Sequence, residues 1–347
     1  MITYLNPQHH VHQGRHEMFR GKLVPCVETA ARVDHVVDEL RRRGLDDIRP
    51  PAHFADHVLR GVHSARYLDF LEHAWDEWIA LDPANASLDA LPSVWPTRTL
   101  RHDVLPQNFA ARMGLFSYDA GSPLTAGTWA AARLGADCAL SAAQAVLGGA
   151  RSAFALTRPP GHHAGKDFFG GYCFLNNAAL AAQHLLDQGL ERVAILDVDY
   201  HHGNGTQACF YDRADVAFAS LHGDPSTEYP FYLGYADETG TGAGLGHNHN
   251  YPLPRGTHFA TWQACLLTAQ DALMSHRPQA LVVSLGLDTY AHDPICGFGL
   301  QSPDYREVGQ TLAQSGLPTV FVFEGGYAVA ALGTNTVNVL QGFEQSL

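Results

Sequence analysis

The sequence predicts an α/β protein built around a parallel β-sheet with helices on both faces. Short apolar stretches typical of buried strands alternate with longer segments of helical periodicity along most of the chain. Such alternation is typical of parallel strands joined by helical crossovers. With 347 residues, 46% of them hydrophobic, the chain can bury a large core. We therefore expect one large domain rather than two smaller ones.

The predicted elements follow from local sequence patterns, taken in chain order. Residues 29–43 carry apolar side chains at helical intervals and end at Gly44, a typical helix stop, and 127–147 is a long Ala-rich segment. The other predicted helices are 63–79, 175–186, 206–211, 259–275, 303–314 and one from residue 328 onward. The predicted strands are the apolar segments 2–5, 152–156, 192–197, 216–222, 280–285 and 319–323.

Two segments do not fit the alternation. Residues 9–19 contain four histidines without helical spacing, and we interpret them as a polar loop. Residues 82–123 are rich in proline and carry Trp95 and Phe109. A long loop with aromatic residues is typical of a channel rim or an interface. We predict an insertion within a single domain spanning 1–347, because the later strands need the first one to complete a sheet.

The charge and cysteine content exclude several classes of protein. Lys and Arg number 22 against 35 Asp and Glu, a net charge of −13, which argues against nucleic-acid binding. The acidic balance is compatible equally with a small cationic substrate and with simple solubility. Six scattered cysteines form no Cys-x-x-Cys pair, and we find no signal peptide and no membrane-spanning run. We expect a soluble cytoplasmic protein without a membrane partner.

The segment ILDVDYHHGNG, residues 195–205, is the most informative in the chain. An apolar strand ends in Asp197 and Asp199, and His201 follows on the same face of the extended backbone. Asp199 and His201 form an Asp-x-His pair whose oxygen and nitrogen suit Zn²⁺, with Fe²⁺, Mn²⁺ and Co²⁺ also compatible. A plain polar loop is the alternative. So many ionisable groups after a buried strand argue against it, because unpaired buried charge is costly.

Polar side chains also follow four other predicted strands. The motifs are RPPGHHAGKDFFGGYCF after residue 157, SLHGDP, SLGLDTYAHDP and EGGY. Ligands of open α/β sheets bind at the carboxyl ends of the strands, so we expect these motifs to line one crevice. Asp288 then completes a metal site with Asp199 and His201, which leaves a position for water or substrate.

The neighbouring residues provide groups for proton transfer. Adjacent His162 and His163 fit a general base and a general acid, with Asp197 and Asn204 as candidates to orient their outer nitrogens. Alone, the histidine pair would be interpreted as a capped turn. Tyr327, after two glycines, is a candidate donor to an oxyanion; the alternative is a tyrosine packed on a core helix.

Aromatic residues near these motifs suggest a substrate channel. Tyr172, which follows Gly171, and Tyr229 could form a slot for an alkyl chain that ends in a cation. As isolated aromatic residues, both are more often packing residues.

The motifs RPPGHHA, GGYCFLNN, DVDYHHGNG, SLHGDP, SLGLDTYAHDP and EGGY occur in this order from Arg158 to Tyr327. In this arrangement the chain resembles the arginase–deacetylase superfamily, and within it the histone deacetylase-like amidohydrolases. The opening GKLVP and the long Pro-rich loop are most similar to bacterial acetylpolyamine amidohydrolases.

The resemblance implies a three-layer fold around an eight-stranded parallel sheet, and an inserted loop that forms a homodimer. It implies that zinc is held by Asp199, His201 and Asp288. His163 would be the main base and acid, with Tyr327 at the oxyanion. Its other implied sites are the tunnel at Gly171, Tyr172 and Tyr229, and a structural K⁺ or Na⁺ site at Asp197, Ser220 and Leu221.

The sequence thus predicts a zinc-dependent deacetylase acting on acetylated polyamines or diamines, or on acetyl-lysine-like amines. Residues 101–121 contain only Asp103 and Asp119 as acidic residues, which argues against a strict polyamine preference and favours shorter acylated diamines or acyl-lysine-like amines. A ureohydrolase of the arginase type is an alternative, but it needs two manganese ions, and Gly203 stands where a further Asp would be required. A non-catalytic sensor of acylated amines is the other alternative.

Overall fold

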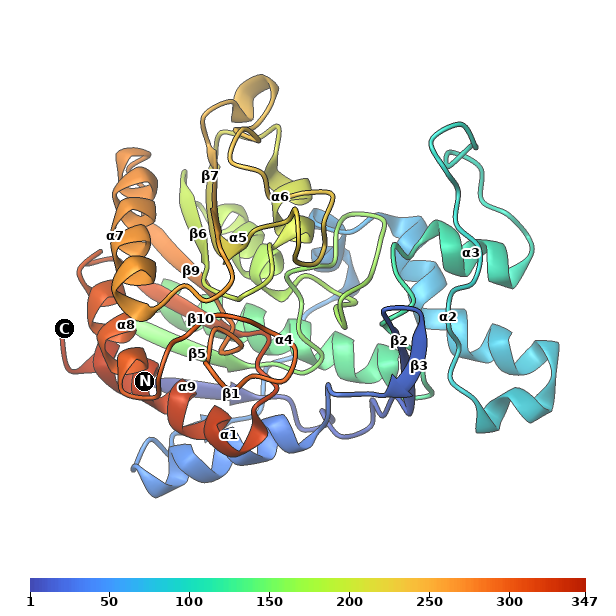
Figure 1. Cartoon of the computed structure of the whole chain (residues 1–347), viewed down its shortest axis with the longest axis horizontal. Helices are drawn as coiled ribbons and strands as arrows, with labels where there is room; N and C mark the ends of the chain where they lie inside the picture. The colour runs from blue at the N-terminus through green and yellow to red at the C-terminus, as the bar shows by residue number, and fades with distance from the viewer.

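Eight parallel strands form the central sheet of the computed structural model, which describes residues 1–347 (Figure 1). This confirms the predicted fold class. Six of the strands coincide with predicted ones to within a residue. Their order across the sheet is β4 (Ile48–Arg49), β1 (Ile2–Leu5), β5 (Ser152–Leu156), β10 (Thr319–Phe323), β9 (Ala280–Leu285), β6 (Val193–Asp197), β7 (Val216–Gly223) and β8 (Asn248–Leu253).

The two edge strands, β4 and β8, carry no sequence pattern that predicts a strand. β4 has only two residues, and β8 has the sequence NHNYPL, whose polar residues carry no strand signal. An edge strand has one neighbour and one solvated side, so it does not need the apolar sequence of a central strand. β8 is recognised only because β7 supplies its hydrogen-bonding partner.

Helices cover both faces of the sheet and give three layers (Figure 1). One face packs against α4 (Thr128–Leu147), α5 (Asn177–Asp187) and α6 (Asn204–Phe210), with α2 (Ala65–Leu81) and α3 (Phe109–Leu115) farther out. The other packs against α1 (Ala31–Arg42), α7 (Phe259–Ser275), α8 (Asp304–Ala313) and α9 (Val329–Glu344).

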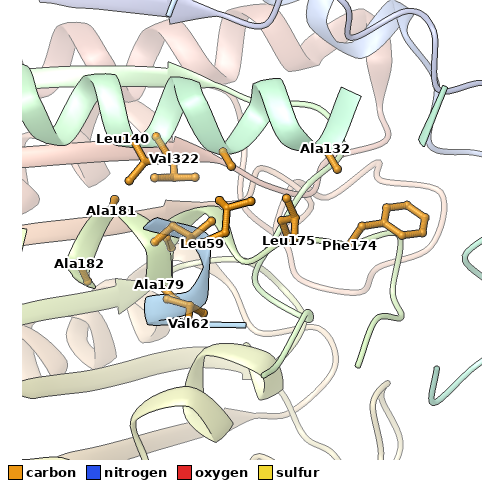
Figure 2. Packing of buried hydrophobic residues seen from close by; sticks show 14 of the residues in the cluster. Leu59, Val62, Ala132, Leu140, Phe174, Leu175, Ala179, Ala181, Ala182 and Val322 are labelled. Carbon is orange, nitrogen blue, oxygen red and sulfur yellow. The ribbon is translucent and has the colours of Figure 1, made fainter. Parts of the chain in front are cut away.

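Each face of the sheet has its own apolar core. In β5, Ala153 and Ala155 belong to the first core, whereas Phe154 and Leu156 belong to the second. Successive side chains of a strand point to opposite faces of the sheet, and in β5 both faces are buried. Figure 2 shows the first core, where small side chains of α5, such as Ala181, lie between Leu140 of α4 and the η1 segment (Asp56–Gly61). Alanines allow these helices to approach the sheet closely.

The prediction of a polar loop over residues 9–19 was wrong at its end. Residues His16–Phe19 form β2, which pairs with antiparallel β3 (Lys22–Pro25). The connecting residues Arg20 and Gly21 have φ of 49° and 78°. Two consecutive positive φ angles are typical of the two-residue type I′ hairpin turn, and Gly21 is its signal. The hairpin stands at the side of the sheet near α2 (Figure 1).

The inserted segment 82–123 contains the short helices η2 (Pro83–Ser87) and α3 but mostly irregular backbone. It extends away from the sheet at the right of Figure 1. The remaining short helix, η3 (Gly242–Gly244), precedes β8. None of the helices is both long and apolar enough to cross a bilayer.

Candidate functional site

The sheet topology brings the predicted site residues to one edge. Strands β5, β10, β9, β6 and β7 are consecutive neighbours and all parallel, so the loops at their carboxyl ends lie side by side. A cavity of about 410 Å³ opens at this edge. His163, His201 and Tyr327, which come from three different loops, line it.

The three predicted metal ligands converge. His201 Nδ1 lies 3.3 Å from Asp199 Oδ1 and 3.1 Å from Asp288 Oδ2. The other carboxylate oxygens are held by backbone N–H groups: Tyr200 donates to Asp288 Oδ1 and Gly325 donates to Asp199 Oδ2, both at 2.8 Å. Buried Asp288 Oδ2 has no hydrogen-bond partner. The facing atoms, His201 Nδ1, Asp199 Oδ1 and Asp288 Oδ2, are therefore positioned to bind one common ion.

The charges at this point favour a cation. Burial and the neighbouring Asp199 carboxylate raise the pKa of Asp288 to about 7. Burial opposes protonation of His201, but the adjacent Asp199 and Asp288 carboxylates raise its pKa to about 10. The group attracts positive charge, and a divalent ion would supply it. Two carboxylate oxygens and one imidazole nitrogen are a suitable donor set for catalytic zinc.

Glycine makes room for these carboxylates. A Cβ at position 325 would lie 2.6 Å from Asp199 Oδ2 and 2.7 Å from Asp288 Oδ2. Any side chain there would displace the ligand oxygens. The close approach of these two carboxylates therefore requires glycine at position 325 of the Glu-Gly-Gly-Tyr motif.

Cys296 also lies close to the candidate metal site, and the sequence analysis did not identify it. Its buried thiol lies with His201 and Asp288 in a group of three potential ligands. However, Cys296 Sγ is 3.9 Å from His201 Nε2, the nitrogen opposite the one that faces the carboxylates. Burial raises the pKa of the Cys296 thiol well above its usual value, so it stays protonated. We therefore assign it no ligand role.

The tandem histidines have different partners. His162 Nδ1 donates to Asp197 Oδ2 at 2.9 Å, and His163 Nδ1 donates to Asn204 Oδ1 at 2.6 Å. Their ring centres are 4.0 Å apart. Because carboxylate and amide oxygens only accept hydrogen bonds, Nδ1 of each ring must be the donor. Nε2 of each ring is then left for another function.

These partners separate the two imidazoles in basicity. Burial opposes protonation of His162, but Asp197 and Asp199 raise its pKa to about 10. Burial and the neighbouring charged His162 hold the pKa of His163 well below its usual value. Only His163 of this pair lines the cavity. A neutral His163 beside the cavity can accept a proton at Nε2, as a general base must.

Tyr327 is held by its backbone and by its ring. Its N–H donates to Asp293 Oδ2 at 2.7 Å, and its ring centre lies 5.0 Å from the Arg32 guanidinium carbon. Burial raises the pKa of the Tyr327 phenol well above its usual value, so the hydroxyl remains a donor. The Arg32 side chain is completely buried.

Arg32 belongs to a buried charge network that joins two of the site loops. Glu28 Oε1 accepts hydrogen bonds of 2.8 Å from both Arg32 and Arg158. Burial would raise the pKa of Glu28, but the two guanidinium groups outweigh it and lower that pKa to about 2. Arg32 also donates to the carbonyl of Gly326 at 2.7 Å. The network therefore fixes the loop before the histidines relative to the loop that carries Tyr327.

The predicted channel walls are tied to acidic residues. The Tyr229 hydroxyl donates to Asp119 Oδ2 at 2.5 Å, and the Tyr172 hydroxyl donates to Glu17 Oε1 at 2.9 Å. All four residues line the cavity. Glu17 was not identified from sequence; the Arg20–Gly21 pair that follows HEMF was the available signal of a hairpin.

Gly171 lies directly against the imidazole of His163. Its φ is +53°, and its N–H donates to Asp119 Oδ2 at 2.8 Å. A Cβ at this position would lie 2.2 Å from His163 Cδ2. Glycine is therefore required both by the backbone conformation and by the closeness of the imidazole.

The residues predicted for a monovalent cation are adjacent and buried. Asp197 and Ser220 are partners across β6 and β7, and Leu221 follows. The Ser220 hydroxyl lies 2.8 Å from His222 Nδ1, so it already has a protein partner. Any cation here would rely on the backbone carbonyl groups and on Asp197.

Comparison with known proteins gives consistent results. The sequence model of the histone deacetylase domain matches residues 26–343. The chain is 53% identical to acetylpolyamine amidohydrolase 2 of Pseudomonas aeruginosa over 99% of both chains. It is 44% identical to acetylpolyamine amidohydrolase of Mycoplana ramosa, again over 99% of both.

A solved structure agrees with the sequence comparisons. The crystal structure of acetylpolyamine aminohydrolase from Burkholderia pseudomallei superposes with a TM-score of 0.95 at 38% identity. The match covers 100% of this chain and 99% of that one. The agreement confirms the resemblance drawn from the strand-end motifs.

Proposed function

Because this chain belongs to the histone deacetylase family, we propose that it is a zinc-dependent amidohydrolase that removes acetyl groups from acetylated diamines and polyamines. Family membership makes it a hydrolase of the deacetylase type. Acetyl-lysine-like amines are the further substrates that we propose. The single observation that carries the proposal is the convergence of Asp199, His201 and Asp288 on one side of the cavity that His163 and Tyr327 line.

We assign roles to the residues around the scissile amide from their contacts. Asp199, His201 and Asp288 would hold the zinc ion, which when bound polarises a carbonyl and makes water more acidic. His163 takes a proton from the attacking water at Nε2 while Asn204 holds Nδ1. The Tyr327 hydroxyl donates to the oxygen that becomes negative. His163 then returns the proton to the departing amine, and His162, bound to Asp197, supplies positive charge beside it.

The cavity chemistry supports an acylated amine as substrate. Tyr172 and Tyr229 provide aromatic walls for methylene groups, and Glu17 and Asp119 lie against them. Buried carboxylates beside aromatic faces favour a cation at the far end of an alkyl chain. The names of the relatives in Pseudomonas aeruginosa and Mycoplana ramosa point to the same substrate class.

The ureohydrolase alternative is disfavoured at Gly203. A Cβ at this position would lie 2.2 Å from Asp197 Oδ2, so an aspartate there would collide with that carboxylate. A second metal ion would lack this ligand. Elemental analysis separates the two candidates, because the ureohydrolase needs two ions per chain.

Acetate release from a substrate panel tests the proposed function. We expect release from acetylputrescine, acetylcadaverine and N8-acetylspermidine, with weaker release from an acetyl-lysine peptide, and inhibition by a hydroxamate chelator. The sensor alternative would bind these amines without turnover. Urea release from agmatine or arginine, with no acetate from any amide, would contradict the proposal.

We also propose that the inserted segment forms a homodimer. It carries a series of exposed large apolar side chains, the most exposed being Leu88 at 53%, Val94 at 58% and Leu100 at 55%. Clusters of this kind on a surface mark protein interfaces. Sedimentation equilibrium should give twice the chain mass, and Val94→Asp with Leu100→Asp should give a monomer. A wild-type monomer at micromolar concentration would refute this part.

Two further assignments complete the proposal. K⁺ or Na⁺ would occupy the site at Asp197, Ser220 and Leu221, and replacing both ions by a large organic cation should lower thermal stability. The six free cysteines fit a reducing compartment such as the cytoplasm. Subcellular fractionation checks that location.

A further inference from the structure

We propose that Arg20 is a specificity-determining residue that admits substrates with one distal ammonium group and disfavours those with a second. It also favours a carboxylate at the second position. This inference rests on the proposed function, since it concerns which acylated amines that site accepts. It is carried by the order of charges along the cavity and by the turn that presents Arg20.

The charged groups that line the cavity differ in exposure. His163 and Tyr327 line the cavity and are buried, and the Glu17 carboxylate, which lines the same cavity, is buried as well. Glu17 Oε1 accepts a hydrogen bond from the Tyr172 hydroxyl, and the buried Glu17 Oε2 has no hydrogen-bond partner. Arg20 is exposed and lines the same cavity.

Arg20 is the free cation of this cavity. None of the ion pairs of the structure includes it, and its guanidinium carbon lies 5.2 Å from the ring centre of Phe19. By contrast, the Glu228 carboxylate, which also lines the cavity, is paired with Arg255 at 3.2 Å. Glu17 and Arg20 are thus both without an ion-pair partner, with the carboxylate buried and the guanidinium nearer to solvent.

The backbone holds Arg20 at this place. Arg20 and Gly21 form the two-residue turn of the β2–β3 hairpin, which closes at the pair Phe19 and Lys22. The Met18 N–H donates to the Ala120 carbonyl at 3.1 Å, which ties the hairpin to the inserted segment. The turn has only two residues, both with positive φ, so the two paired strands determine where Arg20 lies.

This order of charges is expected to distinguish acylated amines that differ in the group beyond the first ammonium. Acetylputrescine places one ammonium group four methylenes from the amide, and N8-acetylspermidine adds an aminopropyl extension with a second ammonium. We expect the first ammonium to meet Glu17 and Asp119, and the second to approach Arg20. Nε-acetyl-lysine differs from acetylcadaverine by a carboxylate, which Arg20 would attract.

The size of the effect follows from the exposure of Arg20. Like charges a few ångströms apart at a protein surface repel weakly, and salt screens them over about 8 Å at physiological ionic strength. We expect kcat/KM for N8-acetylspermidine relative to acetylputrescine to change by about fivefold when the charge is removed. The change should shrink in 1 M salt.

Steady-state kinetics of turn-compatible variants test the inference. Arg20→Asn and Arg20→Asp remove and reverse the charge, and both keep a residue that favours the type I′ turn before Gly21. Lys22→Gln is the matched control, because Lys22 is a cation of the same hairpin that does not line the cavity. The readouts are kcat/KM for the two pairs of amines, N8-acetylspermidine with acetylputrescine and Nε-acetyl-lysine with acetylcadaverine, at low and high salt.

We expect Arg20→Asn to raise the N8-acetylspermidine to acetylputrescine ratio about fivefold, Arg20→Asp to raise it further, and both to lower the Nε-acetyl-lysine to acetylcadaverine ratio. Lys22→Gln should leave both ratios within about twofold of wild type. Unchanged ratios in the Arg20 variants, or equal changes in Lys22→Gln, overturn the inference while acetate release still supports the proposed function. No acetate from any of these amines in the wild type overturns both.

Discussion

Replacing Asp199 by alanine is expected to remove the bound divalent ion and to lower kcat/KM for acetylputrescine by at least about a thousandfold. Asp199 offers Oδ1 at 3.3 Å from His201 Nδ1, and its Oδ2 is already fixed by the Gly325 N–H. Without it, one carboxylate and one imidazole remain. Two ligands are too few for tight zinc binding at a catalytic site, which uses three protein ligands.

Elemental analysis and acetate release should be measured on the same preparation. Wild type is expected to contain one zinc per chain, and Asp199→Ala close to none. Asp271→Ala is the control, because Asp271 is an exposed carboxylate on α7 and its replacement removes one negative charge, as Asp199→Ala does. If Asp199→Ala keeps both its ion and its rate, the assignment of Asp199, His201 and Asp288 as ligands fails.

The strand-end residues were predictable because topology, rather than local sequence, brings them together. Asp199 and Asp288 are far apart in the chain, but each follows a buried apolar strand, and β6 and β9 are neighbours. The rule that ligands bind at carboxyl ends of parallel strands was enough to group them. The resemblance added the roles and the eight-strand count, which the pattern alone put at six.

The remaining residues depend on contacts that no local pattern encodes. Glu17 reaches the cavity because the loop expected at residues 9–19 ends in a strand of the β2–β3 hairpin, and the Arg20–Gly21 turn was the overlooked signal. Glu28 matters only because two arginines from distant segments meet it. Cys296 lies near His201 through the path of an irregular loop. Periodicity cannot predict such contacts, because it reports faces of elements and not the routes of loops.

Tyr327→Phe is expected to lower kcat by about a hundredfold or more, with little change in KM and none in zinc content. The substitution removes one hydroxyl and keeps the ring, which contacts Arg32 and lies 5.6 Å from the ring of Tyr172. The backbone N–H still donates to Asp293. An interaction made mainly in the transition state should therefore be lost while the ground-state cavity is preserved.

Tyr305→Phe provides the control for this substitution. The buried Tyr305 hydroxyl lies 2.9 Å from that of Thr289, but Tyr305 does not line the cavity. Its loss should lower thermal stability and leave kcat within about twofold of wild type, because a buried hydrogen bond contributes to stability and not to the reaction. If Tyr327→Phe instead keeps wild-type turnover, or loses its zinc, the phenol is not the oxyanion donor. The hydrogen bond would then have to come from another group, since the tetrahedral oxygen cannot be left without a donor in a buried site.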